Sequence, residues 1–211
     1  MRSNRRPDVN PIEVTEFLKQ VQEALDDESD RIVLNADESC WRVLIPPKRT
    51  ITNKGKESVA LNIKGDKKAG FTIMGTISSD GEKFPLFMIA EGATERCRKQ
   101  LGNHPNFSYK VIHTESGWMS SGGFLEYLGW IREVVQNEKI YLLVDQYPTH
   151  FTEDAKVAAQ KMNIILIPIP KGGTDRYQPL DRRIFGIMKS MGAARWSEIY
   201  YQNPGIKLDK S

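Results

Sequence analysis

The chain has 211 residues, of which 39% are hydrophobic and 27% are charged, and its formal net charge at pH 7 is +3. This composition excludes a disordered chain and fits one globular domain large enough to bury a core. No apolar run approaches the roughly 18 residues of a membrane span, and the N-terminus lacks the apolar core of a signal peptide. We therefore expect a soluble intracellular protein, whose spread-out basic residues permit contact with nucleic acid without establishing it.

The two cysteines indicate neither a disulfide framework nor a metal site. Cys40 and Cys97 are too few for such a framework, and they do not have the close C-x-x-C spacing of metal-binding cysteines. We expect both to be ordinary thiols that are buried or half-buried.

The first 91 residues predict one helix and then several strands. Asn10-Pro11 is a helix start, because Asn can cap the helix and Pro suits its first turn. Apolar residues follow at helical spacing, at Val14, Phe17, Leu18, Val21 and Leu25, and we expect this helix to pack outside the sheet. Stretches rich in apolar and β-branched residues predict strands at residues 31–36, 41–45, 59–63, 71–77 and 84–90. The second stretch pairs with the first or extends it, and Asp80-Gly81 suits a tight hairpin turn between the last two.

The second half of the chain predicts helices that alternate with buried strands. Residues 140–144 and 164–167 are apolar almost throughout, as in parallel strands covered on both faces. The helix between them, at residues 152–161, completes a parallel unit. Before it, Ser120-Ser121 can cap a helix with a core face of Phe124, Leu128, Ile131 and Val135. A final helix is predicted from about Asp181, with apolar residues at Ile184, Ile187, Met188 and Met191.

Three aspartates stand at the ends of these elements. Asp37 and Asp145 follow apolar strands, and Asp181 opens the final helix, so the three side chains can converge in space. Each carboxylate in such a cluster raises the pKa of its neighbours, so a cluster usually implies a bound cation. Hard oxygen ligands favour Mg²⁺ or Mn²⁺, and two such ions suit in-line attack on a phosphodiester.

The sequences around these aspartates resemble the DDE superfamily endonuclease domain of pogo-like and Tigger-like transposases, to which centromere protein B is related. The matching motifs are Asn35-Ala36-Asp37-Glu38-Ser39, Asp145-Gln146-Tyr147-Pro148-Thr149-His150 and Gln178-Pro179-Leu180-Asp181. Further landmarks lie at residues 85–92, at Gly117-Trp118-Met119 and at Phe124. The similarity extends from about residue 31 to about residue 192, and departs from the family at Gln146, where Asn is usual, and at residues 168–177.

The resemblance implies an α/β ribonuclease-H-like fold, with a mixed sheet of an antiparallel meander plus parallel strands, flanked by helices. It implies that Asp37, Asp145 and Asp181 are catalytic and bind Mg²⁺ or Mn²⁺, and that the domain cleaves DNA and transfers strands. His150, Lys171 and Arg176 are then candidates for support of the site or for DNA contact. DNA is the expected partner, with a homo-oligomer assembled on it, and a nuclear location follows from the eukaryotic family. No membrane and no organic cofactor are expected.

Several residues keep a second interpretation. Asp37 can be a turn residue, with Glu38 as a competing carboxylate, and His150 can merely pack a turn. Trp118 and Phe124 are better interpreted as core than as base-stacking groups. A phosphate groove or ordinary exposed positions explain the basic residues equally well, namely Lys48, Arg49, Lys54, Lys56, Lys171 and Arg176.

The domain organisation predicted is a helical lead-in at residues 1–30, a catalytic domain at 31–200 and a tail at 201–211. About thirty residues precede the first strand, so we expect this chain to lack the helix-turn-helix modules of the family. Two other functions stay open. One is an inactive, host-adopted remnant that binds DNA or chromatin, and the other is a hydrolase of RNA in hybrids.

Overall fold

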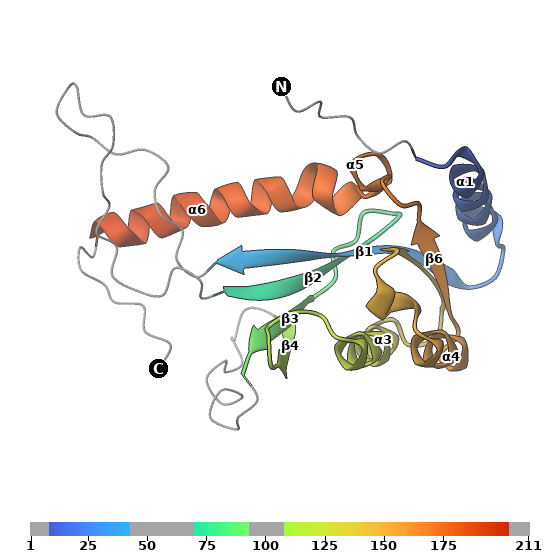
Figure 1. The fold of residues 1–211 in the computed structure, drawn as a ribbon, viewed down its shortest axis with the longest axis horizontal. Coiled ribbons are helices and arrows are strands. Elements are labelled where there is room, and N and C mark those ends of the chain that lie inside the picture. The colour runs from blue at the N-terminus through green and yellow to red at the C-terminus, as the bar shows by residue number, and fades with distance from the viewer. Residues whose placement is uncertain (1–8, 43–69, 93–107, 203–211) are drawn as a thin grey trace.

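The computed structural model of the chain describes residues 9–42, 70–92 and 108–202. They form a mixed six-stranded sheet with helices on both faces (Figure 1). The strand order is β4-β3-β2-β1-β5-β6. The strands are β1 (Arg31–Arg42), β2 (Gly70–Ser78), β3 (Leu86–Glu91), β4 (Tyr109–Thr114), β5 (Lys139–Asp145) and β6 (Ile164–Ile169).

Helices α3 and α4 lie on one side of the sheet, and α6 runs along β1 and β2 on the other (Figure 1). The helices are α1 (Pro11–Asp26), α3 (Ser121–Val135), α4 (Glu153–Lys161), α5 (Thr174–Tyr177) and α6 (Phe185–Gln202). Two short helical turns precede α4 and α6, namely the 3-10 turn η1 (Pro148–Phe151) and the π-helical turn η2 (Leu180–Ile184). Among the described residues, no helix is long and apolar enough to cross a membrane.

Side-chain caps begin three helices where the sequence predicts them. Asn10 accepts a hydrogen bond from the Ile12 N–H at the start of α1. Ser120 caps α3 and Thr152 caps α4 in the same manner. Each cap satisfies a backbone N–H that has no partner within its helix, which fixes the helix start.

The strand pairing confirms the predicted meander and the predicted parallel unit. Antiparallel pairs join β1 to β2 and β2 to β3, with Gly81 at a φ of 94° in the turn before β3. β5 lies parallel to both β1 and β6. β1 continues through Trp41, so that stretch extends the first strand, whereas residues 43–45, 48–56 and 59–63 lie outside the described residues. β4, which the sequence analysis did not predict, pairs in parallel with β3.

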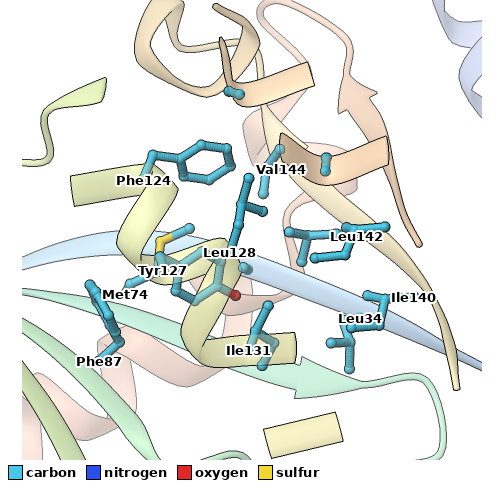
Figure 2. Close-up of a cluster of buried hydrophobic side chains, with 14 of the residues drawn as sticks. Leu34, Met74, Phe87, Phe124, Tyr127, Leu128, Ile131, Ile140, Leu142 and Val144 are labelled. Carbon is cyan, nitrogen blue, oxygen red and sulfur yellow. The ribbon is translucent and has the colours of Figure 1, made fainter. Parts of the chain in front are cut away.

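The main core lies between the sheet and α3. Figure 2 shows Phe124, Tyr127, Leu128 and Ile131 of α3 facing side chains from the strands. The predicted core face of α3 is confirmed, because Phe124, Leu128, Ile131 and Val135 are all buried. The strands contribute Leu34, Met74, Phe87, Ile140, Leu142 and Val144 to this cluster.

A smaller apolar cluster holds α1 against the opposite face. Phe17 and Ala24 of α1 pack there with Val33, Tyr141, Ile167 and Ile169. Asp27, just after α1, accepts hydrogen bonds from Lys139 Nζ at 2.8 Å and Tyr141 Oη at 2.6 Å. These bonds hold the pKa of Asp27 well below its usual range, and they connect the end of α1 to β5.

Two helices bury a narrower stripe than their sequences predict. In α1 the buried positions are Phe17 and Ala24, while Leu18 is 50% exposed and Leu25 is 43% exposed. Each of these two leucines stands one position further round the helix, about 100° away from the sheet-facing stripe. In α6, Ile187 and Met191 are exposed because the side of the helix that faces the sheet carries Phe185 and Gly192.

Two further expectations were wrong. Trp118 was predicted to be core but is 57% exposed, because the neighbouring Met119 occupies the buried position. Cys40 was predicted to be at least half-buried but is exposed, because it lies beyond Ala36, the last core residue of β1 on its face. Cys97 lies outside the described residues.

The start of α6 approaches the sheet closely because of Gly75 in β2. A Cβ atom on Gly75 would lie 2.9 Å from Phe185 Cε1 and 3.5 Å from Leu180 Cδ2. Gly75 also pairs directly with Asp37 across β1 and β2. The absence of a side chain at this position therefore lets the turn that carries Asp181 settle beside Asp37.

We expect Gly75→Ala to lower the free energy of unfolding by about 1–3 kcal/mol, the typical cost of overpacking a core. Equilibrium denaturation in urea measures this effect. Gly129→Ala in α3 is the matched control, because a Cβ there meets nothing within 4 Å and Ala favours a helix interior. If Gly75→Ala is as stable as Gly129→Ala, the close packing at Gly75 does not constrain the fold.

Candidate active site

Asp37 lies in the middle of the sheet, on the face covered by η2 and α6. Its residue is only 8% exposed. Side chains of directly paired residues project on the same face of a sheet, and the partner of Asp37 is Gly75, against which Leu180 and Phe185 pack. Asp37 therefore faces the turn that carries the third acidic motif.

Asp181 is positioned by buried residues on both sides of it. Leu180 and Phe185 are buried and anchor the π-helical turn η2, in which the Phe185 N–H donates to the Leu180 carbonyl. Gln178 is fully buried, and its Nε2 donates to the Ala36 carbonyl of β1 at 3.2 Å. This bond ties the third motif to the residue that precedes Asp37, while Asp181 itself stays exposed. Local π-helical turns are frequent at functional sites.

Asp145 ends β5 beside the same part of β1. The parallel pairing of β1 with β5 reaches Asn35 and Leu143, and the Asn35 Nδ2 donates to the Leu143 carbonyl at 3.3 Å. Asp37 and Asp145 each stand two residues beyond this pair. Asp145 is the last residue of β5, at the carboxyl end of a parallel strand, where ligands bind in open α/β sheets. Asp37 was expected at a strand end but lies inside β1, because β1 continues to Arg42 along β2 after its pairing with β5 has ended.

The surroundings of Asp37 raise its pKa. Burial raises it first, and the charges of Asp181, Asp145 and Glu38 raise it further, against a hydrogen bond from the Glu38 backbone N–H. Together these effects raise the pKa of Asp37 to about 8. The structure thus brings Asp37, Asp145 and Asp181 into one electrostatically coupled group.

His150 joins two carboxylates from opposite sides of its ring. Its Nδ1 lies 2.9 Å from Asp145 Oδ1, and its Nε2 lies 3.0 Å from Glu38 Oε1. The ring is almost fully buried and packs 4.4 Å from the Phe124 ring, measured between centroids. Glu38 therefore points toward His150, on the face opposite to Asp37, which separates the two acids that the sequence analysis left in competition.

The environment of His150 favours a protonated imidazole. Burial lowers the pKa of His150, but its hydrogen bonds to Asp145 and Glu38 outweigh this effect and raise the pKa to about 9. Both ring nitrogens then carry a proton and donate to a carboxylate. This arrangement fixes the orientation of Asp145 and offsets part of the negative charge around it.

The predicted basic residues lie in different places. Lys171 lines a small hollow together with Asp145. Arg176 is exposed in α5, and its backbone carbonyl accepts a hydrogen bond from Arg182 Nη1 at 3.1 Å. Lys48, Arg49, Lys54 and Lys56 lie outside the described residues.

Two residues with a role in the geometry were not singled out from the sequence. Gln178 and Asn35 belong to quoted motifs, but their amide bonds to the Ala36 and Leu143 carbonyls appear only in three dimensions. A signal was present, because each stands two or three residues before a motif aspartate. A side-chain amide that is buried usually forms a hydrogen bond.

The residues around Asp37 fit a divalent cation. Asp37 Oδ2 is buried and has no hydrogen-bond partner in the described part of the chain, and a buried oxygen in this state is unfavourable. Among the described residues, no three His, Cys, Asp or Glu side chains already form a metal-binding cluster. Charges repel one another over longer distances than a metal–ligand bond spans. The aspartates can therefore influence one another's pKa although their oxygens are not yet close enough to surround a metal ion.

Comparison with known families gives a match over two motifs. The family model described as DDE superfamily endonuclease matches residues 68–206. This range contains Asp145 and Asp181, whereas Asp37 lies before it. The pogo transposable element with KRAB domain is 26% identical over 167 residues in both mouse and human, which covers 77% of this chain. This chain spans only 27% of the length of those relatives.

Solved structures of the Mos1 mariner transposase have the same fold. The Mos1 strand transfer complex has a TM-score of 0.58 at 10% sequence identity, covering 95% of this chain and 57% of the Mos1 chain. The Mos1 paired end complex with Mn has a TM-score of 0.57 at 10% identity, covering 93% and 57%. The ribonuclease-H-like fold expected from the sequence is thereby confirmed. The chain belongs to the DDE superfamily endonuclease family and is related within it to the pogo-like transposable elements.

Proposed function

We propose that this chain is the catalytic domain of a transposase-type DNA endonuclease, which cleaves DNA strands and transfers them with the help of a divalent metal. The observation that carries the proposal is the coupling of Asp37 to Asp181 and Asp145, because the three motifs meet at one buried carboxylate. Membership of the DDE endonuclease family supports the same reaction class.

Asp37, Asp145 and Asp181 would together hold one or two Mg²⁺ or Mn²⁺ ions. When bound, such ions activate an attacking water or 3′-hydroxyl and stabilise the leaving oxygen of the phosphodiester. The carboxylates match the oxygen ligands that these ions prefer. A Mos1 transposase complex of the same fold has been solved with Mn, which supports the choice of metal.

The residues of the chain prepare this site in distinct ways. Asp37 must lose the proton that its raised pKa retains before it can act as a ligand. His150 holds one oxygen of Asp145, which leaves the other oxygen free for the metal. Gln178 keeps the Asp181 motif attached to β1 through the Ala36 carbonyl.

DNA is the proposed substrate and partner. Two Mos1 structures of this fold are named as strand transfer and paired end complexes of a transposase, and Lys171 brings a cation to the neighbourhood of Asp145. Assembly of two or more copies on DNA and a nuclear location are part of the same proposal. The expected lack of helix-turn-helix modules and the three domain boundaries stay predictions from the sequence.

Asp145→Asn should abolish Mn²⁺-dependent nicking of supercoiled DNA. We expect the loss to exceed the roughly 10- to 100-fold that typically follows removal of a residue that only orients a metal ligand. Asp154→Asn is the matched control, since Asp154 is an exposed carboxylate at the start of α4. If the parent and Asp145→Asn nick DNA equally well, Asp145 is not part of the catalytic site. If the parent binds DNA but never nicks it, the alternative of an inactive, DNA-binding remnant is supported instead.

Asp37→Asn should stabilise the metal-free protein as the pH rises. Asp37 keeps its proton up to a pKa of about 8 in the folded chain, against 3.8 for an unperturbed Asp. Between those values the folded state binds more protons than the unfolded state, so raising the pH costs up to about 1.4 kcal/mol per unit. Asn has no proton to lose and avoids this cost.

The measurement is Tm in the presence of a chelator, from about pH 5 to about pH 8.5. We expect the Tm advantage of Asp37→Asn to grow by several degrees across this range, since 1 kcal/mol corresponds to roughly 2–4 °C in a chain of this size. The deprotonation of His150 destabilises both proteins alike as the pH rises toward 9. A Tm difference that does not change with pH would show that Asp37 is ionised in the metal-free protein.

A further inference from the structure

A small hollow lies beside Asp145, where the loops that follow β5 and β6 meet. Its volume is about 190 Å³. Asp145, Gln146 and Tyr147 line one side, and residues 169–172 with Thr174 line the other. Most small-molecule sites measure ~300–1,000 Å³, so this hollow has room for one planar ring or one phosphate group rather than for a whole organic cofactor.

Tyr147 presents an aromatic side chain at this hollow. The residue is 51% exposed, although large aromatic side chains are usually buried. Its backbone is fixed, because its carbonyl accepts a hydrogen bond from the His150 N–H at the start of η1. Its ring meets the His150 ring edge-on at 5.9 Å between centroids. The aromatic side chain is thus exposed but held in place by the residue that orients Asp145.

The opposite side of the hollow supplies polar groups. Lys171 is exposed and carries a positive charge, and Thr174 contributes a hydroxyl group. Gln146 adds a half-buried amide on the Tyr147 side. An aromatic ring, a cation and hydrogen-bonding groups around a single-ring space are the features with which proteins bind one nucleotide of a single strand.

We propose that the hollow binds one unpaired nucleotide of the DNA next to the bond that is cut, with its base stacked on Tyr147 and its phosphate beside Lys171. This inference rests on the proposed function, and it defines the form of the substrate. A base inside a duplex has both faces covered by its neighbours, so it must leave the stack before it can contact Tyr147. The domain therefore prefers DNA that is frayed or single-stranded beside the cleavage point.

The test measures binding of the whole chain to two DNA duplexes. One is blunt, and the other ends in an unpaired overhang that carries the fluorescent base 2-aminopurine. The variants are Tyr147→Ala, Tyr147→Phe and Lys171→Ala, with Trp118→Ala as the matched control because Trp118 is an exposed aromatic residue that does not line the hollow.

We expect the parent to bind the overhang more tightly and to quench its fluorescence. Tyr147→Ala should lose the quenching and about tenfold of the affinity for the overhang, consistent with the usual contribution of one stacked base. Tyr147→Phe, which keeps the ring, should restore both, and Trp118→Ala should match the parent. Lys171→Ala should bind the overhang more weakly, and neither Tyr147→Ala nor Tyr147→Phe should change the affinity for blunt duplex.

Three outcomes overturn the inference. If the parent nicks DNA but binds both duplexes equally, or if Tyr147→Ala retains parental quenching, the hollow is not a nucleotide site while the proposed function stands. If Tyr147→Ala weakens binding to both duplexes equally, Tyr147 contributes to general DNA affinity instead. If the parent neither binds nor nicks any DNA, the proposed function fails and this inference fails with it.

Discussion

Burial of Asp37 and repulsion from the carboxylates around it are the two constraints on which the site depends. Because Asp37 is buried next to Asp181, Asp145 and Glu38, its pKa is raised to about 8. The fold by itself therefore does not stabilise the charged form of this carboxyl group. Its Oδ2 is a buried oxygen without a hydrogen-bond partner among the described residues. A structure that holds such a group in place gives up stability at a position where a cation can bind.

The rest of the architecture keeps the acids together despite this repulsion. Gly75 leaves space for Leu180 and Phe185 beside Asp37, and Gln178 bonds to the backbone of β1. On the other face, His150 supplies the positive charge that Asp145 and Glu38 share. Apolar packing of the His150 ring on Phe124 extends this support into the main core. The site is therefore held by buried contacts on both faces of the sheet.

Much of the fold follows from the sequence because periodicity and caps are local properties. The α3 face, the β2–β3 hairpin and the apolar strand β5 are visible in this way. The pairing of β4 with β3, the exposed side of α6 and the exposure of Trp118 depend on which elements meet in space, so they could not be derived. The acidic motifs could be recognised from their residues. That Asp37 and Glu38 point to opposite faces of the sheet could be seen only from the position of β1 in the sheet and from the contact of Glu38 with His150.

Calorimetric titration of Mn²⁺ into the chain near pH 7, repeated in buffers of different ionisation enthalpy, tests the central claim most directly. If Asp37 exchanges its proton for a metal, binding releases protons, and this release fades as the pH passes about 8. Asp37→Asn and Asp181→Asn should lose the saturable binding. Mn²⁺ binding without proton release, or no binding in either the presence or the absence of DNA, would contradict the account.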